Sequence, residues 1–168
     1  MFHLFYKIKG FTLIEIMVVM VIIGVILGFA TLSIGDGGQA RKLEQEVQRL
    51  ASLLTLASEE AIMQAKEMGV YFEKEGYRFY ENGQVLTMQQ DDLFRPRILP
   101  SGIQTEIRLE GEPVILNNTK NEPQLWLLSS GEFTPFEVIF TVESDETLRY
   151  RLTGTVTGIM NIQRDEVF

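Results

Sequence analysis

The stretch that decides the fold is Lys9-Gly10-Phe11-Thr12-Leu13-Ile14-Glu15, followed at once by the apolar run IMVVMVIIGVILGFATLSI at residues 16–34. The run has 19 residues and no charge. As a helix it would extend about 28 Å, at about 1.5 Å per residue, close to the ~30 Å hydrocarbon thickness of a bilayer. A buried helix in a soluble domain is the alternative, but such a helix seldom needs apolar residues on every face. We therefore expect a membrane-spanning helix over residues 11–35.

The charges before this run predict its orientation and its processing. Lys7 and Lys9 precede it without any acid, and positive flanks stay in the cytoplasm, so the rest of the chain would face outward. An ordinary secretory signal is cleaved after its apolar core, whereas this basic stretch ends at Gly10, before the run. Cleavage between Gly10 and Phe11 would leave the apolar helix on the mature chain.

Glu15 is an acid placed directly beside the apolar run. A carboxylate at the centre of a membrane helix costs about 2.5–3.5 kcal/mol, and less near the interface. One interpretation places Glu15 at the headgroup boundary. The other gives it a partner, because cleavage before Phe11 would expose a cationic α-amine nearby and an adjacent subunit would offer a second one. In that interpretation Glu15 sets the register between subunits.

The segment from Lys9 to Glu15, together with the apolar run, resembles the signature of type IV pilins and pseudopilins. The resemblance implies that residues 1–10 are a prepilin leader, which a membrane-embedded prepilin peptidase removes by cutting after Gly10. It implies that the same enzyme methylates the new N-terminal residue, Phe11. It also implies that Glu15 helps to dock subunits into a filament, so that residues 11–35 form the filament core.

The remaining residues, 36–168, are expected to form a globular domain with an amphipathic helix over 36–68 and a β region over 69–168. The glycines of Gly35-Asp36-Gly37-Gly38 should break or loosen the helix before it, because each costs up to ~1 kcal/mol in a helix. We expect the apolar face of the second helix to pack on the domain's own sheet, and Gly69 to end it. The apolar residues recur at the spacing of one helical face, and they are Leu43, Val47, Leu50, Leu54, Ala57, Ala61 and Ala65.

The β region contains short alternating or aromatic segments that are typical of strands. Asn82-Gly83 is a favourable two-residue hairpin turn, Gly154 stands between the last two expected strands, and residues 91–100 and 113–123 are expected to be loops. A long helix followed by these strands predicts an α+β protein whose helix covers one face of an antiparallel β-sandwich-like domain. The expected strands are 70–73, 77–80, 84–88, 103–109, 124–128, 136–142, 148–153 and 156–162.

Residues that could carry chemistry are sparse. The chain has no cysteine, and its single histidine, His3, lies in the expected leader, so the mature chain would lack histidine bases and thiolate metal sites. Ser129-Ser130-Gly131 lacks the G-x-S-x-G frame of a nucleophile elbow and is expected to be a turn. The acidic pairs at 91–92, 145–146 and 165–166 lack the periodic spacing of a calcium loop. We therefore expect no enzymatic activity, no metal and no cofactor.

A second stretch, Leu125-Trp126-Leu127-Leu128-Ser129-Ser130-Gly131-Glu132-Phe133-Thr134-Pro135-Phe136, resembles the H-type minor pseudopilins of type II secretion (GspH) and the related FimT-like minor pilins. The resemblance implies a pilin-like fold and a structural subunit of the periplasmic pseudopilus, a filament that helps to export folded proteins across the outer membrane. The implied partners are other pseudopilins, through the N-terminal helix, the prepilin peptidase and the inner-membrane secretion platform. The implied location is the bacterial inner membrane, crossed once, with a cytoplasmic N-terminus and a periplasmic domain.

Two alternatives stay open from the sequence. A FimT-like minor pilin of a type IV pilus or DNA-uptake system would share the N-terminal signature. DNA binding would favour a basic face, however, and the net charge of −8 at pH 7 repels phosphate backbones, so we expect no nucleic-acid partner. A membrane-tethered periplasmic enzyme or ligand-binding module would require a deep, polar, convergent pocket.

Processing at Gly10 predicts a specific mature N-terminus. Mass spectrometry of the protein purified from cells with an active prepilin peptidase should find a chain that starts at N-methylated Phe11. The physical reason is that the cut precedes the apolar run, so the helix stays on the product. An intact Met1 in such cells would contradict the prediction.

Overall fold

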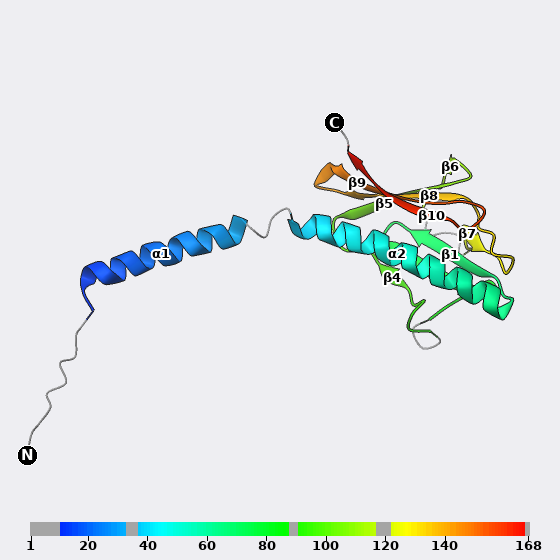
Figure 1. Cartoon of the computed structure of the whole chain (residues 1–168), viewed down its shortest axis with the longest axis horizontal. Helices are drawn as coiled ribbons and strands as arrows, with labels where there is room; N and C mark the ends of the chain where they lie inside the picture. Colours follow the sequence, from blue (N-terminus) through cyan, green and yellow to red (C-terminus); the bar gives the residue numbers. More distant parts are fainter. Residues whose placement is uncertain (1–10, 33–36, 88–90, 117–121, 167–168) are drawn as a thin grey trace, which may run out of the picture. The chain divides into compact units, whose positions relative to one another are not determined.

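The computed structural model describes residues 11–32, 37–87, 91–116 and 122–166. The chain divides into two compact units, Met1–Gly38 and Gln39–Phe168, and the elements are labelled in Figure 1. The first unit carries helix α1 (Leu13–Leu32), and helix α2 (Gly37–Gln64) runs into the second. The interruption expected at 35–38 falls only partly where predicted, because Gly37 and Gly38 belong to the first turn of α2. Residues 33–36 lie outside the described ones.

Helix α2 buries one apolar face and ends in a Schellman motif. Six of the seven residues of the predicted stripe, from Leu43 to Ala61, are fully buried, whereas Ala65 adopts a left-handed φ of 50° just after the helix. The Lys66 N–H donates to the Ala61 carbonyl at 3.1 Å and the Ala65 N–H to the Ile62 carbonyl at 3.4 Å, which is the hydrogen-bond pattern of this cap. The helix therefore ends at Gln64, earlier than the predicted 68.

Gly69 does not end the helix, and the prediction that it does is wrong. It lies inside the first strand of the second unit, where it pairs with Tyr80 on one side and Trp126 on the other. A Cβ at this position would lie 2.6 Å from the Pro123 Cβ. The glycine is thus needed for the close approach of a distant segment, not for a helix stop.

Two antiparallel sheets of five strands each follow α2 in the described part of the chain. Sheet A has the order β3-β2-β1-β7, with β4 also pairing with β2, and sheet B has the order β10-β9-β8-β5-β6. Sheet A contains β1 (Met68–Glu73), β2 (Gly76–Glu81), β3 (Gln84–Val85), β4 (Arg97–Ile98) and β7 (Leu125–Leu127). Sheet B contains β5 (Ile103–Leu109), β6 (Glu112–Pro113), β8 (Phe136–Val142), β9 (Asp145–Gly154) and β10 (Met160–Glu166).

One hydrophobic core joins α2 to both sheets. Figure 1 shows α2 lying across the two sheets, and the same buried cluster contains Leu50 from the helix, Phe79 from sheet A and Phe140 from sheet B. Burial of each such side chain contributes on the order of 1.5–3 kcal/mol. The arrangement confirms the predicted α+β class, with a helix packed on antiparallel sheets.

Two-residue turns set the register of two hairpins. Asn82 and Gly83 have positive φ values of 47° and 80°, as a type I′ turn requires, and they join β2 to β3 as predicted. Glu110 and Gly111 have φ values of 51° and 88° and join β5 to β6 in the same way. The second turn was not predicted from the sequence, although its Glu-Gly pair follows an alternating strand.

Several expected strand bounds and loops need correction. Gly154 is the last residue of β9 rather than a link between strands. A glycine is required there because a Cβ would overlap the Phe136 ring. The last strand runs over Met160–Glu166, not 156–162, since residues 155–159 form the turn before it. The expected loops at 91–100 and 113–123 each contain strand residues, Arg97–Ile98 of β4 and Pro113 of β6.

The end of α2 at Ala65 and the close approach at Gly69 can be tested together. Ala65→Gly should raise the free energy of unfolding by about 0.5–1 kcal/mol, because a glycine adopts the left-handed conformation at no steric cost. Gly69→Ala should lower it by about 1–3 kcal/mol, because the added methyl overlaps Pro123. Urea unfolding followed by the fluorescence of Trp126 measures both changes.

A helix that continued to residue 68 would reverse the result at position 65, because Ala65→Gly would then place a glycine in a helix interior and lower the free energy of unfolding. Gly38→Ala is a matched control, because no atom lies within 4 Å of the place that its added methyl would take, and it should leave stability equal or slightly higher.

Candidate functional site

Of the predicted site residues, the structure describes Phe11 and Glu15. Gly10 lies outside the described residues, and Phe11 is 73% exposed. Thr12 precedes α1 as its N-cap, since the Glu15 N–H approaches the Thr12 Oγ1 at 3.3 Å. Thr12 and Glu15 thus stand at the first and fourth positions of a capping box. This pattern gives Glu15 a local role at the positive end of the helix dipole, which the sequence interpretations overlooked.

Helix α1 presents apolar side chains to the outside on all of its faces. Every described side chain from Leu13 to Leu27 is exposed, and most of them are aliphatic. Over the described residues, no helix reaches the length and hydropathy that a membrane crossing requires. The membrane-spanning role of residues 11–35 stays a prediction.

The serine and aspartate residues of the second unit that were considered as catalytic or metal-binding candidates form local hydrogen bonds and turns. Ser129-Ser130-Gly131 forms a tight turn, as expected, in which the Gly131 N–H donates to the Leu128 carbonyl at 2.9 Å. Asp91 accepts the backbone N–H of Leu93 at 2.7 Å. His3 lies outside the described residues. No group of three potential metal ligands occurs in the part of the chain that the structure describes.

The remaining acidic pairs are also engaged in local contacts. Asp145 accepts the backbone N–H of Thr147 at 3.0 Å, and hydrogen bonds from Thr147 lower the pKa of the Asp145 carboxyl. Asp165 pairs with Arg151 at 2.8 Å across neighbouring strands. These carboxylates therefore cap a turn and link strands rather than converge on a common point.

Glu46 is a buried carboxylate that the sequence reasoning missed. It is only 1% exposed on the core side of α2, where it accepts the Tyr77 hydroxyl at 2.9 Å and pairs with the Arg49 guanidinium at 2.6 Å. Burial, followed by the nearby Glu46 charge, raises the pKa of Tyr77 far above its ordinary value, so the phenol remains a donor. A signal was present, because Glu46 lies three residues after Leu43 and one before Val47, on the buried stripe.

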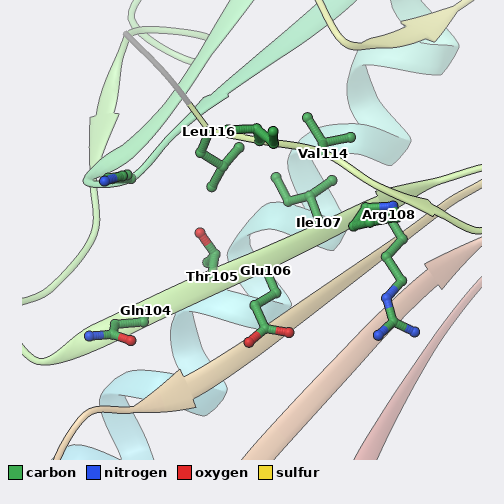
Figure 2. A pocket seen from close by; sticks show the side chains of 10 residues that line it. Gln104, Thr105, Glu106, Ile107, Arg108, Val114 and Leu116 are labelled. Carbon is green, nitrogen blue, oxygen red and sulfur yellow. The ribbon is translucent and has the colours of Figure 1, made fainter.

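A groove of about 560 Å³ runs along β5 and is called the β5 groove below. It is lined by Lys74, residues 104–108 of β5 and residues 113–116. Figure 2 shows Thr105 and Ile107 on one side of the strand with Val114 and Leu116, while Gln104, Glu106 and Arg108 project from the other. The inner side of the groove is thus mainly apolar, and its charged and amide side chains from β5 lie on the other side of the strand.

Comparison with known families identifies the chain. The family model described as "Type II transport protein GspH" matches residues 46–158, which is most of the second unit. The chain belongs to the GspH family. A second family model, "Prokaryotic N-terminal methylation motif", matches residues 6–31 and so spans the predicted cut between Gly10 and Phe11.

Two relatives of this GspH-family chain are both named type II secretion system protein H. It is 36% identical to type II secretion system protein H of Pseudomonas aeruginosa over 77% of this chain and 81% of the relative. It is 28% identical to type II secretion system protein H of Aeromonas hydrophila over 94% of each chain. These matches favour type II secretion over the type IV pilus alternative.

The fold of the GspH-family chain also matches a solved structure. The crystal structure of the minor pseudopilin EpsH from Vibrio cholerae superposes with a TM-score of 0.63. The superposition covers 76% of this chain and 98% of EpsH at 23% sequence identity, so it shows a shared fold. The predicted pilin-like architecture is therefore confirmed.

The Glu46–Tyr77 contact predicts a pair of contrasting tyrosine variants. Tyr77→Phe should lower the free energy of unfolding by about 1–3 kcal/mol, because it leaves a buried carboxylate oxygen without its donor. Tyr80→Phe on the same strand should be close to neutral, since the buried Tyr80 hydroxyl has no hydrogen-bond partner among the described residues. Urea unfolding curves measure both, and equal losses would show that the Glu46 contact is not the cause.

Proposed function

We propose that this GspH-family chain is a minor pseudopilin, a non-enzymatic structural subunit of the type II secretion pseudopilus that helps to export folded proteins across the outer membrane. The observation that carries the proposal is the coincidence of two matches, the GspH family over residues 46–158 and the methylation motif over residues 6–31. One match supports the secretion system, and the other supports a pilin-type N-terminus.

The surface of α1 supports a role in assembly. Apolar side chains exposed around the whole helix need a cover, because an apolar surface of this size in water is unfavourable. Before assembly, the cover would be the inner membrane, with Lys7 and Lys9 on the cytoplasmic side and the second unit in the periplasm. In the filament, the cover would be the equivalent helices of other pseudopilins.

Processing would convert the membrane form into the assembling form. The prepilin peptidase would cut between Gly10 and Phe11 and methylate Phe11, and the inner-membrane secretion platform would receive the product. Glu15 lies exposed in the first turn of α1. There it would pair with the terminal amine of a neighbouring subunit, since two opposite charges attract strongly once apolar surroundings exclude water.

Variants of Glu15 separate the docking role from the capping role. Glu15→Gln keeps a residue that can complete a capping box but removes the charge, whereas Glu15→Asp keeps the charge. If docking is electrostatic, Glu15→Ala and Glu15→Gln should both lose incorporation into the filament, and Glu15→Asp should retain more of it. Crosslinking of the subunit to other pseudopilins in membranes measures incorporation.

Secretion of a folded periplasmic substrate into the medium is the functional readout. Deletion of the gene should trap the substrate in the periplasm, and the unmodified gene should restore its release. Full incorporation of Glu15→Gln would reject the docking role while leaving the subunit function intact. Normal secretion after deletion would contradict the proposed function itself.

A further inference from the structure

One edge of sheet B is only partly covered by its last strand. The short strand β6 pairs with Arg108 and Leu109 at the end of β5, and the Val114 N–H adds one bond to the Ile107 carbonyl at 2.8 Å. The preceding residues of β5, from Ile103 to Glu106, have no strand partner on this side within the described ranges.

Backbone groups of this open stretch point away from the sheet. Neighbouring residues of an antiparallel strand direct their N–H and C=O groups to opposite sides. Because the Ile107 carbonyl faces β6, Thr105 must direct its backbone groups to the same open edge, while Gln104 and Glu106 pair with β8. The Ile103 N–H is already taken by the Pro100 carbonyl at 3.1 Å. Among the residues that the structure describes, nothing pairs with the Thr105 N–H and C=O, which leaves both to an incoming backbone.

The β5 groove lies along this same edge. Its inner side carries Ile107, Val114 and Leu116 close to Thr105 (Figure 2). Lys74, from the turn between β1 and β2, lines the groove as well, and no ion pair of Lys74 occurs among the described residues. The groove thus combines backbone hydrogen-bonding groups, an apolar wall and the Lys74 cation, while Glu106 and Arg108 project from the other side of β5.

We propose that the β5 groove binds an extended segment of a partner protein, which adds to β5 as a further strand. Strand addition supplies affinity through backbone hydrogen bonds and specificity through alternate side chains. The alternate apolar side chains of the segment pack against the half-buried Val114 and Leu116, and an acidic residue of the segment meets Lys74. This site goes beyond the role of α1 in assembly, and its existence does not depend on that role.

The dimensions and charges of the groove fit a strand better than a compact ligand. A segment of about five residues centred opposite Thr105 would be about 17 Å long, at roughly 3.3 Å per residue. Thr105 supplies its backbone bonds, because the Ile103 N–H and the Ile107 carbonyl are already taken. An extended backbone presents a C=O and an N–H at the spacing that satisfies both Thr105 groups at once. The charge of Lys74 favours a segment that is acidic at one end.

The decisive variant removes a single N–H group. Thr105→Pro deletes the Thr105 N–H, and proline is tolerated on an edge strand whose N–H faces solvent. Thr105→Val is the matched control, because it keeps the N–H and a β-branched side chain. Both are made in the full chain, which is purified in detergent micelles and checked for a cooperative urea transition.

The probe is a synthetic, fluorescently labelled peptide with the sequence Asp-Val-Thr-Val-Thr-Val and blocked ends. Fluorescence anisotropy should give binding to the unmodified chain and to Thr105→Val, with affinity at least about tenfold weaker for Thr105→Pro because backbone bonds are lost. Lys74→Glu should weaken binding of this peptide and strengthen binding of a peptide that begins with Lys instead of Asp.

Several outcomes would overturn the proposal. Equal affinity of the Pro and Val variants would exclude backbone pairing at Thr105, and absence of binding to the unmodified chain at millimolar peptide would exclude the site. A dimer of the unmodified chain that Thr105→Pro dissociates, without any peptide binding, would assign the groove to a second copy. If Thr105→Pro does not fold, a peptide N-methylated at alternate residues replaces it, and undiminished binding of that peptide to the unmodified chain would reject strand addition.

Discussion

The buried face of α2 is the contact on which the rest of the second unit depends. Residues from Leu43 to Ala61 lie along one side of the helix and touch a core that both sheets share. Neither sheet closes a core alone, since sheet A and sheet B each leave one face to be covered and α2 covers both. A carboxylate in this face, Glu46, is tolerated because Tyr77 and Arg49 satisfy its oxygens, and burial without partners would cost several kcal/mol.

The two helices of the chain need different surroundings for their apolar side chains. Helix α2 is amphipathic and finds its cover within its own unit, whereas α1 is apolar on all sides and exposed along its described length. A helix of the second kind needs lipid or other protein chains around it. The contrast explains why the proposed role in assembly rests on α1 rather than on α2.

The outer face of sheet B is charged, whereas its edge along β5 is partly open and apolar. The outer face carries opposite charges on neighbouring strands, with Glu137 of β8 between Arg108 of β5 and Arg151 of β9, and Asp165 of β10 beyond. Such charges keep the face soluble and discourage unwanted strand pairing. The β5 edge beside Thr105 lacks a covering strand among the described residues and is lined by an apolar wall, which is the opposite of a protected edge.

The sequence by itself determined the features that depend on neighbouring residues. The periodic stripe of α2, the Asn82-Gly83 hairpin and the strands 103–109 and 136–142 follow from local patterns, and the structure places them as predicted. The motif from Lys9 to Glu15 and the stretch from Leu125 to Phe136 indicated the family. Only the tertiary structure decided where α2 ends, why Gly69 and Gly154 are glycines, how Glu46 is satisfied and where β5 is open. Gly69, Gly154 and Glu46 depend on contacts with residues far away in the chain, which are Pro123, Phe136 and Tyr77, and no local pattern records which distant segments meet.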